Sequence, residues 1–313
     1  MDFLRSIPNV SQSSSELSPS EFPSVESEYE DPITQLAREA KQQPFITKES
    51  LQKSLEHRQR ALQQDQTWDQ YLVFTSVPAA QYSRLSDDRS RISKYSRLLY
   101  NAEMRILIAK VMPNPAHELA IRSFDSLIFL ELRAMNVHND VWPFGSTTVT
   151  VGNWKKEADC CWAPASTNVR LSFVVEVGLL ESARRLALDA RGWLETHSSS
   201  VKLVVTISIK PNNPEIVLHR WELVSLGHGV LTRSSPLSAR RTASLKLSRT
   251  NDATIVTGES YMNGTNTATT QLDLSFDKVV GRPPHRPLEK DLKISEQELR
   301  SFAEKIWSAQ SLL

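Results

Sequence analysis

The stretch from Lys155 to Ser182 constrains this chain most, because each of its two short apolar runs contains one carboxylate. Asp159 lies in EADCCWA, and Glu176 lies in the middle of FVVEVG. A charged carboxylate inside an apolar strand is costly unless it is paired, hydrogen-bonded or bound to a metal. Two such residues on consecutive strands predict a divalent-cation site.

The geometry of a strand allows these two acids to meet. Asp159 shares a strand face with Glu157, and it converges with Glu176 if the two strands are neighbours in suitable register. Two carboxylates with water molecules suit Mg²⁺ or Mn²⁺, which prefer oxygen ligands. Glu118, at the start of a predicted helix, could supply or orient a third carboxylate. Such a site could activate water and stabilise charge on a phosphodiester.

Each of these acids also has a purely structural explanation. Asp159 could cap a turn or pair with Lys155 or Lys156, and Glu176 could belong to a structural ion pair. Glu118 could be an ordinary acid in the first turn of a helix, where the helix dipole favours a carboxylate. The residues alone leave these alternatives open.

The composition is that of an ordinary globular protein. Of 313 residues, 40% are hydrophobic and 23% charged, and the net charge of +1 gives no electrostatic argument for nucleic acid or membrane as a partner of the whole chain. The two cysteines, Cys160 and Cys161, are adjacent, which disfavours a disulfide and fits a reducing compartment. No run approaches the roughly 18 apolar residues of a membrane span. We therefore expect an intracellular protein of the nucleus or cytoplasm, neither secreted nor membrane-spanning.

The patterning divides the chain into three parts. Residues 1–42 are rich in Ser, Glu and Pro, and we expect a disordered tail because such a segment buries too little apolar surface to offset its ordering entropy. Residues 43–94 contain the helix-forming run KESLQKSLEHRQRALQQ and form a predicted helical extension. Residues 95–313 form the predicted folded domain.

Within that domain the periodicity alternates between helix and strand. The expected order is a helix over 117–136, strands at 147–152, 157–163 and 171–178, a helix at 182–197, and strands at 201–209 and 214–223. Ser295 and Glu298 form a capping box that predicts the start of a C-terminal helix. This order predicts an α/β fold, a central mixed sheet flanked by helices.

These motifs resemble the PD-(D/E)XK nuclease superfamily, which has the restriction-endonuclease-like fold. The residues that carry the resemblance are KEAD at 156–159, EVG at 176–178 with Glu181 and Ser182, and DARGWL at 189–194. At these positions the chain also resembles uncharacterised fungal proteins in which the third motif of the superfamily, E-x-K, is degenerate and reads E-x-G. The resemblance covers roughly residues 95–225 and implies a metal-dependent nuclease core with Glu118, Asp159 and Glu176 as its acidic positions.

The chain departs from the superfamily pattern where it matters for catalysis. Gly178 stands where the motif has a lysine, which orients the attacking water and offsets charge in the transition state. The site is therefore either inactive or uses a cation from elsewhere in the chain. The candidate cations are Lys156, Arg184, Arg185 and Lys202. An arginine can bind a phosphate, but it is a poor base because it stays protonated.

Two further features bear on partners. His117, beside Glu118, could touch a metal or make local hydrogen bonds. The segment 231–250 contains four arginines and one lysine, among them Arg240, Arg241, Lys246 and Arg249, and no acid. It could contact the backbone of DNA or RNA, although we expect it to be a solvated loop. Three interpretations follow: a metal-dependent nuclease, a catalytically inactive protein of the same fold that binds nucleic acid or another protein, or an unrelated α/β scaffold with structural carboxylates.

Overall fold

A computed structural model describes residues 31–313 except 65, 68, 88–95, 113–114, 167, 180–182, 226–236 and 263–264. Residues 31–313 form one compact unit. The predicted tail up to residue 30, Glu181 and Ser182 lie outside the described residues. None of the described helices combines the length and the apolar character that crossing a membrane requires.

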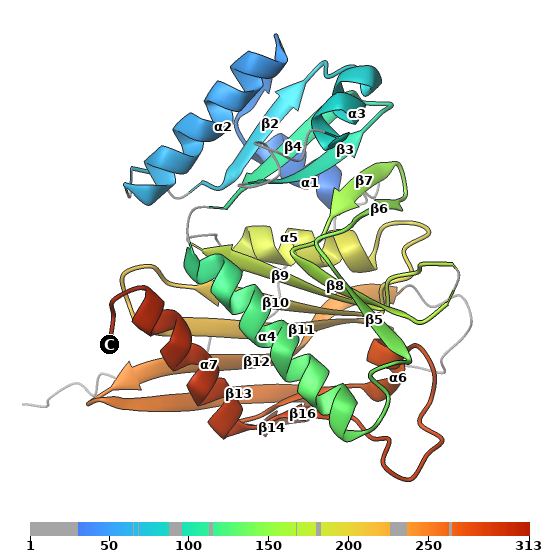
Figure 1. The fold of residues 1–313 in the computed structure, drawn as a ribbon, viewed down its shortest axis with the longest axis vertical. Helices are drawn as coiled ribbons and strands as arrows, with labels where there is room; N and C mark the ends of the chain where they lie inside the picture. Colours follow the sequence, from blue (N-terminus) through green and yellow to red (C-terminus); the bar gives the residue numbers. More distant parts are fainter. Residues whose placement is uncertain are drawn as a thin grey trace, which may run out of the picture. The chain divides into compact units, whose positions relative to one another are not determined.

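The described helices and strands are distributed along the chain as follows (Figure 1). The helices are α1 (Pro32–Glu39), α2 (Lys48–Gln63), α3 (Ala79–Asp87), α4 (Pro115–Ala134), α5 (Ala183–Leu194), α6 (Phe276–Val280) and α7 (Glu296–Ala309). The strands are β1 (Gln42–Pro44), β2 (Tyr71–Thr75), β3 (Ser96–Asn101), β4 (Ile106–Val111), β5 (Val141–Gly145), β6 (Thr148–Val151), β7 (Trp154–Glu157), β8 (Cys160–Pro164), β9 (Phe173–Leu179), β10 (Leu203–Ile209), β11 (Glu215–Ser225), β12 (Leu237–Thr250), β13 (Ala253–Met262), β14 (Thr265–Ala268), β15 (Leu272–Leu274) and β16 (Leu292–Ile294).

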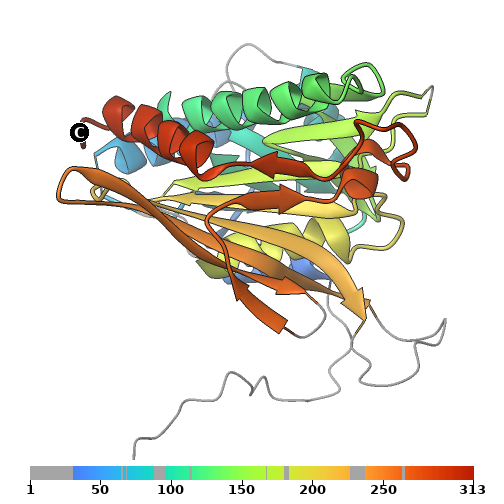
Figure 2. The same cartoon turned by 90° about the horizontal axis from the view of Figure 1, so that it is seen from below.

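The larger sheet has eight strands in the order β14-β13-β12-β11-β10-β9-β8-β5. Only β9 and β10 pair in parallel among its described strands, and α5 connects them. Helices α4 and α7 lie on one face and α5 on the other (Figure 2). The sheet is therefore mixed and flanked by helices, as the sequence predicts.

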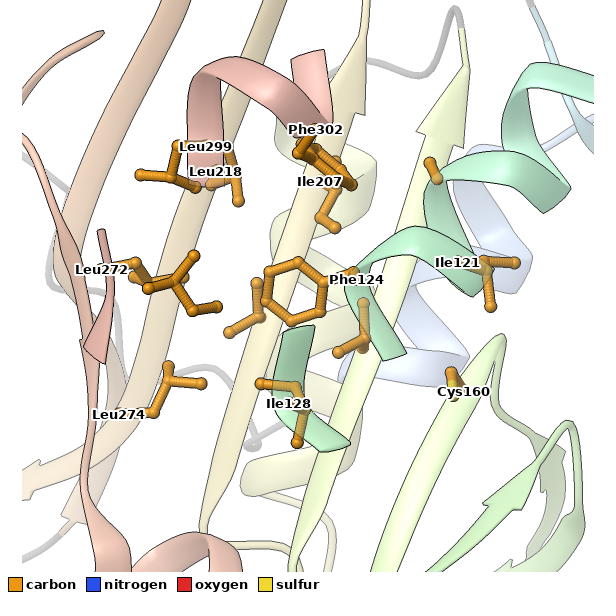
Figure 3. Packing of buried hydrophobic residues seen from close by; sticks show 14 of the residues in the cluster. Ile121, Phe124, Ile128, Cys160, Ile207, Leu218, Leu272, Leu274, Leu299 and Phe302 are labelled. Atoms are coloured by element: carbon orange, nitrogen blue, oxygen red, sulfur yellow. The ribbon is translucent and has the colours of Figure 1, made fainter. Parts of the chain in front are cut away.

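The core of this sheet forms where α4 and α7 pack on it. Phe124 of α4 and Phe302 of α7 meet edge to face with their ring centroids 6.1 Å apart, over Ile207 and Leu218 of the sheet (Figure 3). The buried positions of α4 recur every three or four residues, which is the spacing of one helix face. This packing fixes the start of α4 against the strand that contains Glu176.

A second sheet of six strands, in the order β1-β2-β4-β3-β7-β6, is built mainly from the N-terminal third of the described chain. Helices α2 and α3 pack against it with Leu51, Leu55, Tyr82 and Leu85. Its other face packs against α1 and Leu188 of α5. Helix α5 therefore lies between the two sheets.

Several predicted elements are confirmed. Helices α4, α5 and α7 and strands β6, β9, β10 and β11 lie where periodicity places them. The capping box is also present, with the Ser295 hydroxyl accepting from the Glu298 backbone and the Glu298 carboxylate accepting from the Ser295 backbone. The predicted α/β order is present in α4, β8, β9, α5 and β10, with β5, β6 and β7 between α4 and β8.

The prediction of one strand over 157–163 is wrong. The chain leaves the six-stranded sheet at Glu157, the end of β7, and enters the eight-stranded sheet at Cys160, the start of β8. Ala158 and Asp159 form the connection, and both are buried. Strand alternation therefore does not determine where the Asp159 side chain points.

Three other expectations differ from the structure. The basic segment is a strand, not a loop, from Leu237 to Thr250, because apolar side chains at alternate positions, such as Leu245 and Leu247, enter the core. Helix α1 lies inside the range 1–42, where composition predicts disorder, because Ile33, Leu36 and Ala37 bury a small apolar face. The range 43–94 contains strands β1 and β2 besides its helices.

Candidate functional site

The register of the larger sheet brings Asp159 and Glu176 together. Strand β8 pairs antiparallel with β9, and Cys160 lies opposite Val175. Asp159, which precedes Cys160, therefore lies beside Glu176, and its Oδ2 accepts a 2.9 Å hydrogen bond from the backbone N–H of Val177. Both carboxylates are buried, with 1% and 2% of their surfaces exposed.

A lysine from the other sheet lies between these carboxylates. The Nζ of Lys110, on β4, is 3.1 Å from Asp159 Oδ2 and 3.1 Å from Glu176 Oε2. Lys110 is itself only 2% exposed. A single buried ammonium thus bridges both acids that the sequence singles out.

A second lysine and a third carboxylate extend this cluster. Lys156 Nζ lies 2.5 Å from Asp189 Oδ1, on α5, and Lys110 Nζ lies 3.6 Å from Asp189 Oδ2. The Lys156 ammonium also lies over the ring of Trp193, 4.4 Å from its centroid. Trp193 donates its indole N–H to Glu176 Oε1 at 2.7 Å. We call Lys110, Lys156, Asp159, Glu176 and Asp189 the ion cluster.

The start of α4 contributes His117 rather than Glu118 to this cluster. His117 is fully buried, and its Nε2 lies 3.1 Å from the Val177 carbonyl oxygen and 3.5 Å from Asp159 Oδ2. The Glu118 side chain is 47% exposed and lies 3.6 Å from the guanidinium of Arg97. Arg97, on β3, lies 3.8 Å from Asp159 Oδ1 and thus between Glu118 and the cluster. The described geometry does not place Glu118 as a third ligand beside Asp159 and Glu176.

The electrostatics of the cluster separate its three acids. Burial raises the pKa of Asp159, but Lys110, His117 and Arg97 outweigh burial and hold that pKa well below its usual range. Burial also raises the pKa of Asp189, but the charges of Lys156 and Lys110 outweigh burial, so that this pKa is lowered. Burial and the neighbouring Asp189 charge raise the pKa of Glu176, and Lys110 only partly opposes them. Glu176 is therefore the acid of the cluster that is protonated first as pH falls.

The remaining predicted cations lie outside the cluster. Arg184 pairs with Glu39 of α1 at 2.7 Å, and Arg185 pairs with Asp69, which precedes β2. Both arginines of the first turn of α5 are thus neutralised by acids from the N-terminal part of the described chain. Lys202 is exposed just before β10. None of the three supplies charge to Asp159 or Glu176 through a described contact.

The donor set does not fit Mg²⁺ or Mn²⁺ as the cluster stands. A divalent ion would need the carboxylate oxygens at about 2.0–2.6 Å, in the space that the Lys110 ammonium occupies. The described residues contain no group of three His, Cys, Asp or Glu side chains arranged to hold a metal ion. Lysine, tryptophan and backbone donors contact Asp159 Oδ2 and both oxygens of Glu176. Asp159 Oδ1 is buried without a hydrogen-bond partner, and the nearest cation to it among the described ion pairs is Arg97 at 3.8 Å.

Sequence reasoning missed Lys110 and Asp189 as members of the cluster. Lys110 lies in the apolar run RILIAKVM and is as anomalous in a buried strand as Glu176 in FVVEVG. Asp189 lies on the same helix face as Leu186, Ala190 and Trp193, at helical spacing. Both signals were present in the sequence, but the pairing depends on contacts between two sheets.

Of the four cations that the structure describes in the basic segment, two lack an ion pair among the described contacts. Arg240 and Arg241 are exposed on β12. Lys246 pairs with Glu215 at 2.6 Å, and Arg249 pairs with Asp252 at 3.2 Å. Arg240 and Arg241 lie on the eight-stranded sheet, which also contributes Glu176 to the ion cluster.

Comparison with known proteins identifies no family for this chain. No family model and no curated protein matches it. Among solved structures, it is similar to a candidate nuclease belonging to DUF820 from Anabaena variabilis. The two share 11% identity over 46% of this chain and 76% of that one, with a TM-score of 0.29. A likeness at that level carries no argument about function.

Proposed function

We propose that this chain is a catalytically inactive member of the restriction-endonuclease-like fold that acts as a binding module. The observation that supports this proposal is the position of Lys110, 3.1 Å from both Asp159 and Glu176 in a buried cluster. The acids that would bind a catalytic cation are instead used in ion pairs between the two sheets.

Charge balance supports the same proposal. Lys110 and Lys156 lie beside Asp159 and Asp189, the two acids with lowered pKa values, so each of these carboxylates already has a cationic partner. A divalent ion would have to displace a buried lysine and leave that ammonium without its carboxylates, which is costly. A phosphodiester would also have to reach acids with 1–2% exposure.

A cleavage assay tests the proposal. The purified full chain is incubated with Mn²⁺ and with single-stranded DNA, double-stranded DNA and RNA, beside Asp159→Asn and Glu176→Gln. We expect the same background with all three proteins. Cleavage by the wild type that both variants lose would overturn the proposal.

Lys110 also favours one alternative, a metal-dependent nuclease. It brings a lysine beside Asp159 and Glu176, which is the cation that Gly178 fails to supply. In that case, cleavage would be lost in Lys110→Met as well as in the two acid variants. The same assay therefore distinguishes the two functions.

For the binding partner, we propose nucleic acid contacted through Arg240 and Arg241. Both are exposed on one strand, whereas Lys246 and Arg249 have acidic partners. Backbone contacts of this kind give salt-dependent binding without sequence preference. Fluorescence anisotropy with labelled DNA and RNA should show that Arg240→Ala/Arg241→Ala lowers the salt slope by about 0.7–0.9 per arginine. The matched control, Lys246→Ala/Arg249→Ala, should change the slope less; equal slopes for the two double variants would refute this surface.

A further inference from the structure

A hollow of about 420 Å³ lies between α4 and the strands β5 and β8, away from the residues of the ion cluster. Apolar side chains form most of its wall: Phe129, Leu130 and Leu132 of α4, Val141 and Pro143 of β5, and Trp162 of β8. Phe129 and Leu130 are 43% and 53% exposed at its edge. This volume and this lining are typical of a site for a small ligand or a side chain.

One acid lies in this apolar wall. Asp125, on α4, is half-buried, and its described hydrogen-bond partner is the Cys160 thiol, with Sγ 3.8 Å from Oδ1. Burial raises the pKa of Asp125, and the charge of Arg122, one turn earlier on the same helix, only partly opposes it. Asp125 makes no ion pair within 4.0 Å among the described contacts. Because Asp125 lines the hollow, a cation bound there could pair with it without displacing a described ion pair.

The residues that line the hollow favour a cationic ligand over an anionic one. Among the described residues that line the hollow, none is a lysine or arginine. The aromatic rings of Phe129 and Trp162 lie in the same wall, and an ammonium is attracted to the face of such rings. His138, whose ring meets Phe129 edge to face at 6.0 Å, has a buried Nδ1 without a hydrogen-bond partner. The hollow therefore combines apolar surface with one carboxylate and one ring nitrogen that lacks a hydrogen-bond partner.

We propose that this hollow binds a molecule that combines an apolar group with one positive charge, with Asp125 as its anionic partner. The occupant is a free arylalkyl amine, a molecule small enough for a hollow of about 420 Å³. The apolar group fills the hollow between Phe129 and Val141, and the ammonium donates to the Asp125 carboxylate. This site is independent of the proposed function, because it shares no residue with the ion cluster.

Ligand-observed NMR titrations of the full chain with three matched probes test the proposal. The probes are 2-phenylethylamine, the uncharged 2-phenylethanol and the anionic 3-phenylpropionate. We expect the amine to bind about tenfold more tightly than the alcohol, which is the usual gain from one charge-assisted hydrogen bond. The acid should bind more weakly than the alcohol.

Three variants locate the binding. Asp125→Asn should reduce the amine to the affinity of the alcohol, whereas Asp252→Asn, which removes an exposed acid on the β12–β13 turn, should leave the preference unchanged. Ser126→Trp, at an exposed α4 position on the edge of the hollow, should weaken all probes without disturbing the core. Circular dichroism confirms that each variant is folded.

The outcomes are distinct. The proposal is overturned if the wild type does not bind the amine, binds amine and alcohol equally, or if Asp125→Asn keeps the preference. The source of the ligand follows from acetyl-Phe-Lys-amide compared with acetyl-Phe-Gln-amide. A lysine peptide that binds tenfold more tightly than 2-phenylethylamine would indicate a protein partner and overturn the assignment of a free amine; a lysine peptide that binds no more tightly supports the free amine.

Discussion

Lys110 determines how the buried acids of this molecule are satisfied. Its ammonium contacts Asp159 and Glu176 from a different sheet, and it lies within 3.6 Å of Asp189. A buried ion pair adds little net stability over a well-packed apolar pair, but the loss of one partner leaves a charge unpaired inside the protein. The cluster is therefore far more sensitive to the removal of Lys110 than to changes at surface lysines.

Lys110→Met keeps the length of the side chain and removes its charge. We expect it to lower the free energy of unfolding by about 3–5 kcal/mol, because Asp159 and Glu176 then lack their ammonium. Lys202→Met, at an exposed position just before β10, is the matched control and should change stability by less than about 0.5 kcal/mol. Urea unfolding measures both, and a Lys110→Met variant as stable as the control would contradict the role of the cluster.

Glu176 gives the molecule a pH dependence with a defined sign. Burial and Asp189 raise its pKa, so between the ordinary value of about 4.3 and the raised value the folded chain binds more protons than the unfolded chain. The free energy of unfolding should fall as pH rises through this window. Asp159 and Asp189 have lowered pKa values, so the stability that they contribute is lost at pH values below this window, where they become protonated.

Glu176→Gln cannot ionise and should lack this fall. Urea unfolding of the wild type and the variant from pH 5 to pH 8 measures the difference in unfolding free energy. We expect the variant to become more stable relative to the wild type as pH rises. Parallel curves over this range would show that Glu176 keeps the same protonation state in the folded and unfolded chains.

At the level of elements, sequence predicted the larger sheet better than the path between the sheets. The apolar runs that become β9 and β10 and the amphipathic pattern of α4 are local signals. The break between β7 and β8 has no such signal, because EADCCWA has the residues of one strand and Asp159 is buried at the connection. Which sheet each half joins depends on pairing with β3 and β9, far away in the sequence.

At Gly192, packing against α1 outweighs the helix propensity of α5. Alanine would favour the helix by about 1 kcal/mol. A Cβ at this position would lie 2.8 Å from Cγ1 of Ile33 in α1 and 3.4 Å from Nζ of Lys156. Glycine therefore suits the close approach of α1 and α5, because a larger residue would have to displace the buried Ile33 side chain.

We expect Gly192→Ala to destabilise the protein by about 1 kcal/mol, because an overpacking cost of about 1–3 kcal/mol exceeds the helix gain. In Ile33→Ala/Gly192→Ala the added methyl group has space, so the two effects should not be additive. Thermal unfolding of the two single variants and the double variant measures the coupling. Additive effects would show that α1 does not limit α5 at this position.

At the scale of the whole molecule, the ion cluster connects the two sheets. Lys110 and Lys156 belong to the six-stranded sheet, Glu176 belongs to the eight-stranded sheet, and Asp189 belongs to the helix between them. The sequence allowed Asp159 and Glu176 to be singled out as costly buried charges. It did not reveal that lysines from the other sheet would match them, since the contact spans 49 residues for Lys110–Asp159 and 66 for Lys110–Glu176.

Calorimetric titration of the full chain with Mn²⁺ at neutral pH tests most directly whether Lys110 takes the place of a metal ion. Wild type, Asp159→Asn and Glu176→Gln are compared, because each variant removes one carboxylate that a metal would need. If the lysine occupies the site, all three proteins give the same heats and no Mn²⁺ binds between Asp159 and Glu176. Binding of one Mn²⁺ by the wild type that both variants lose would contradict this role for Lys110.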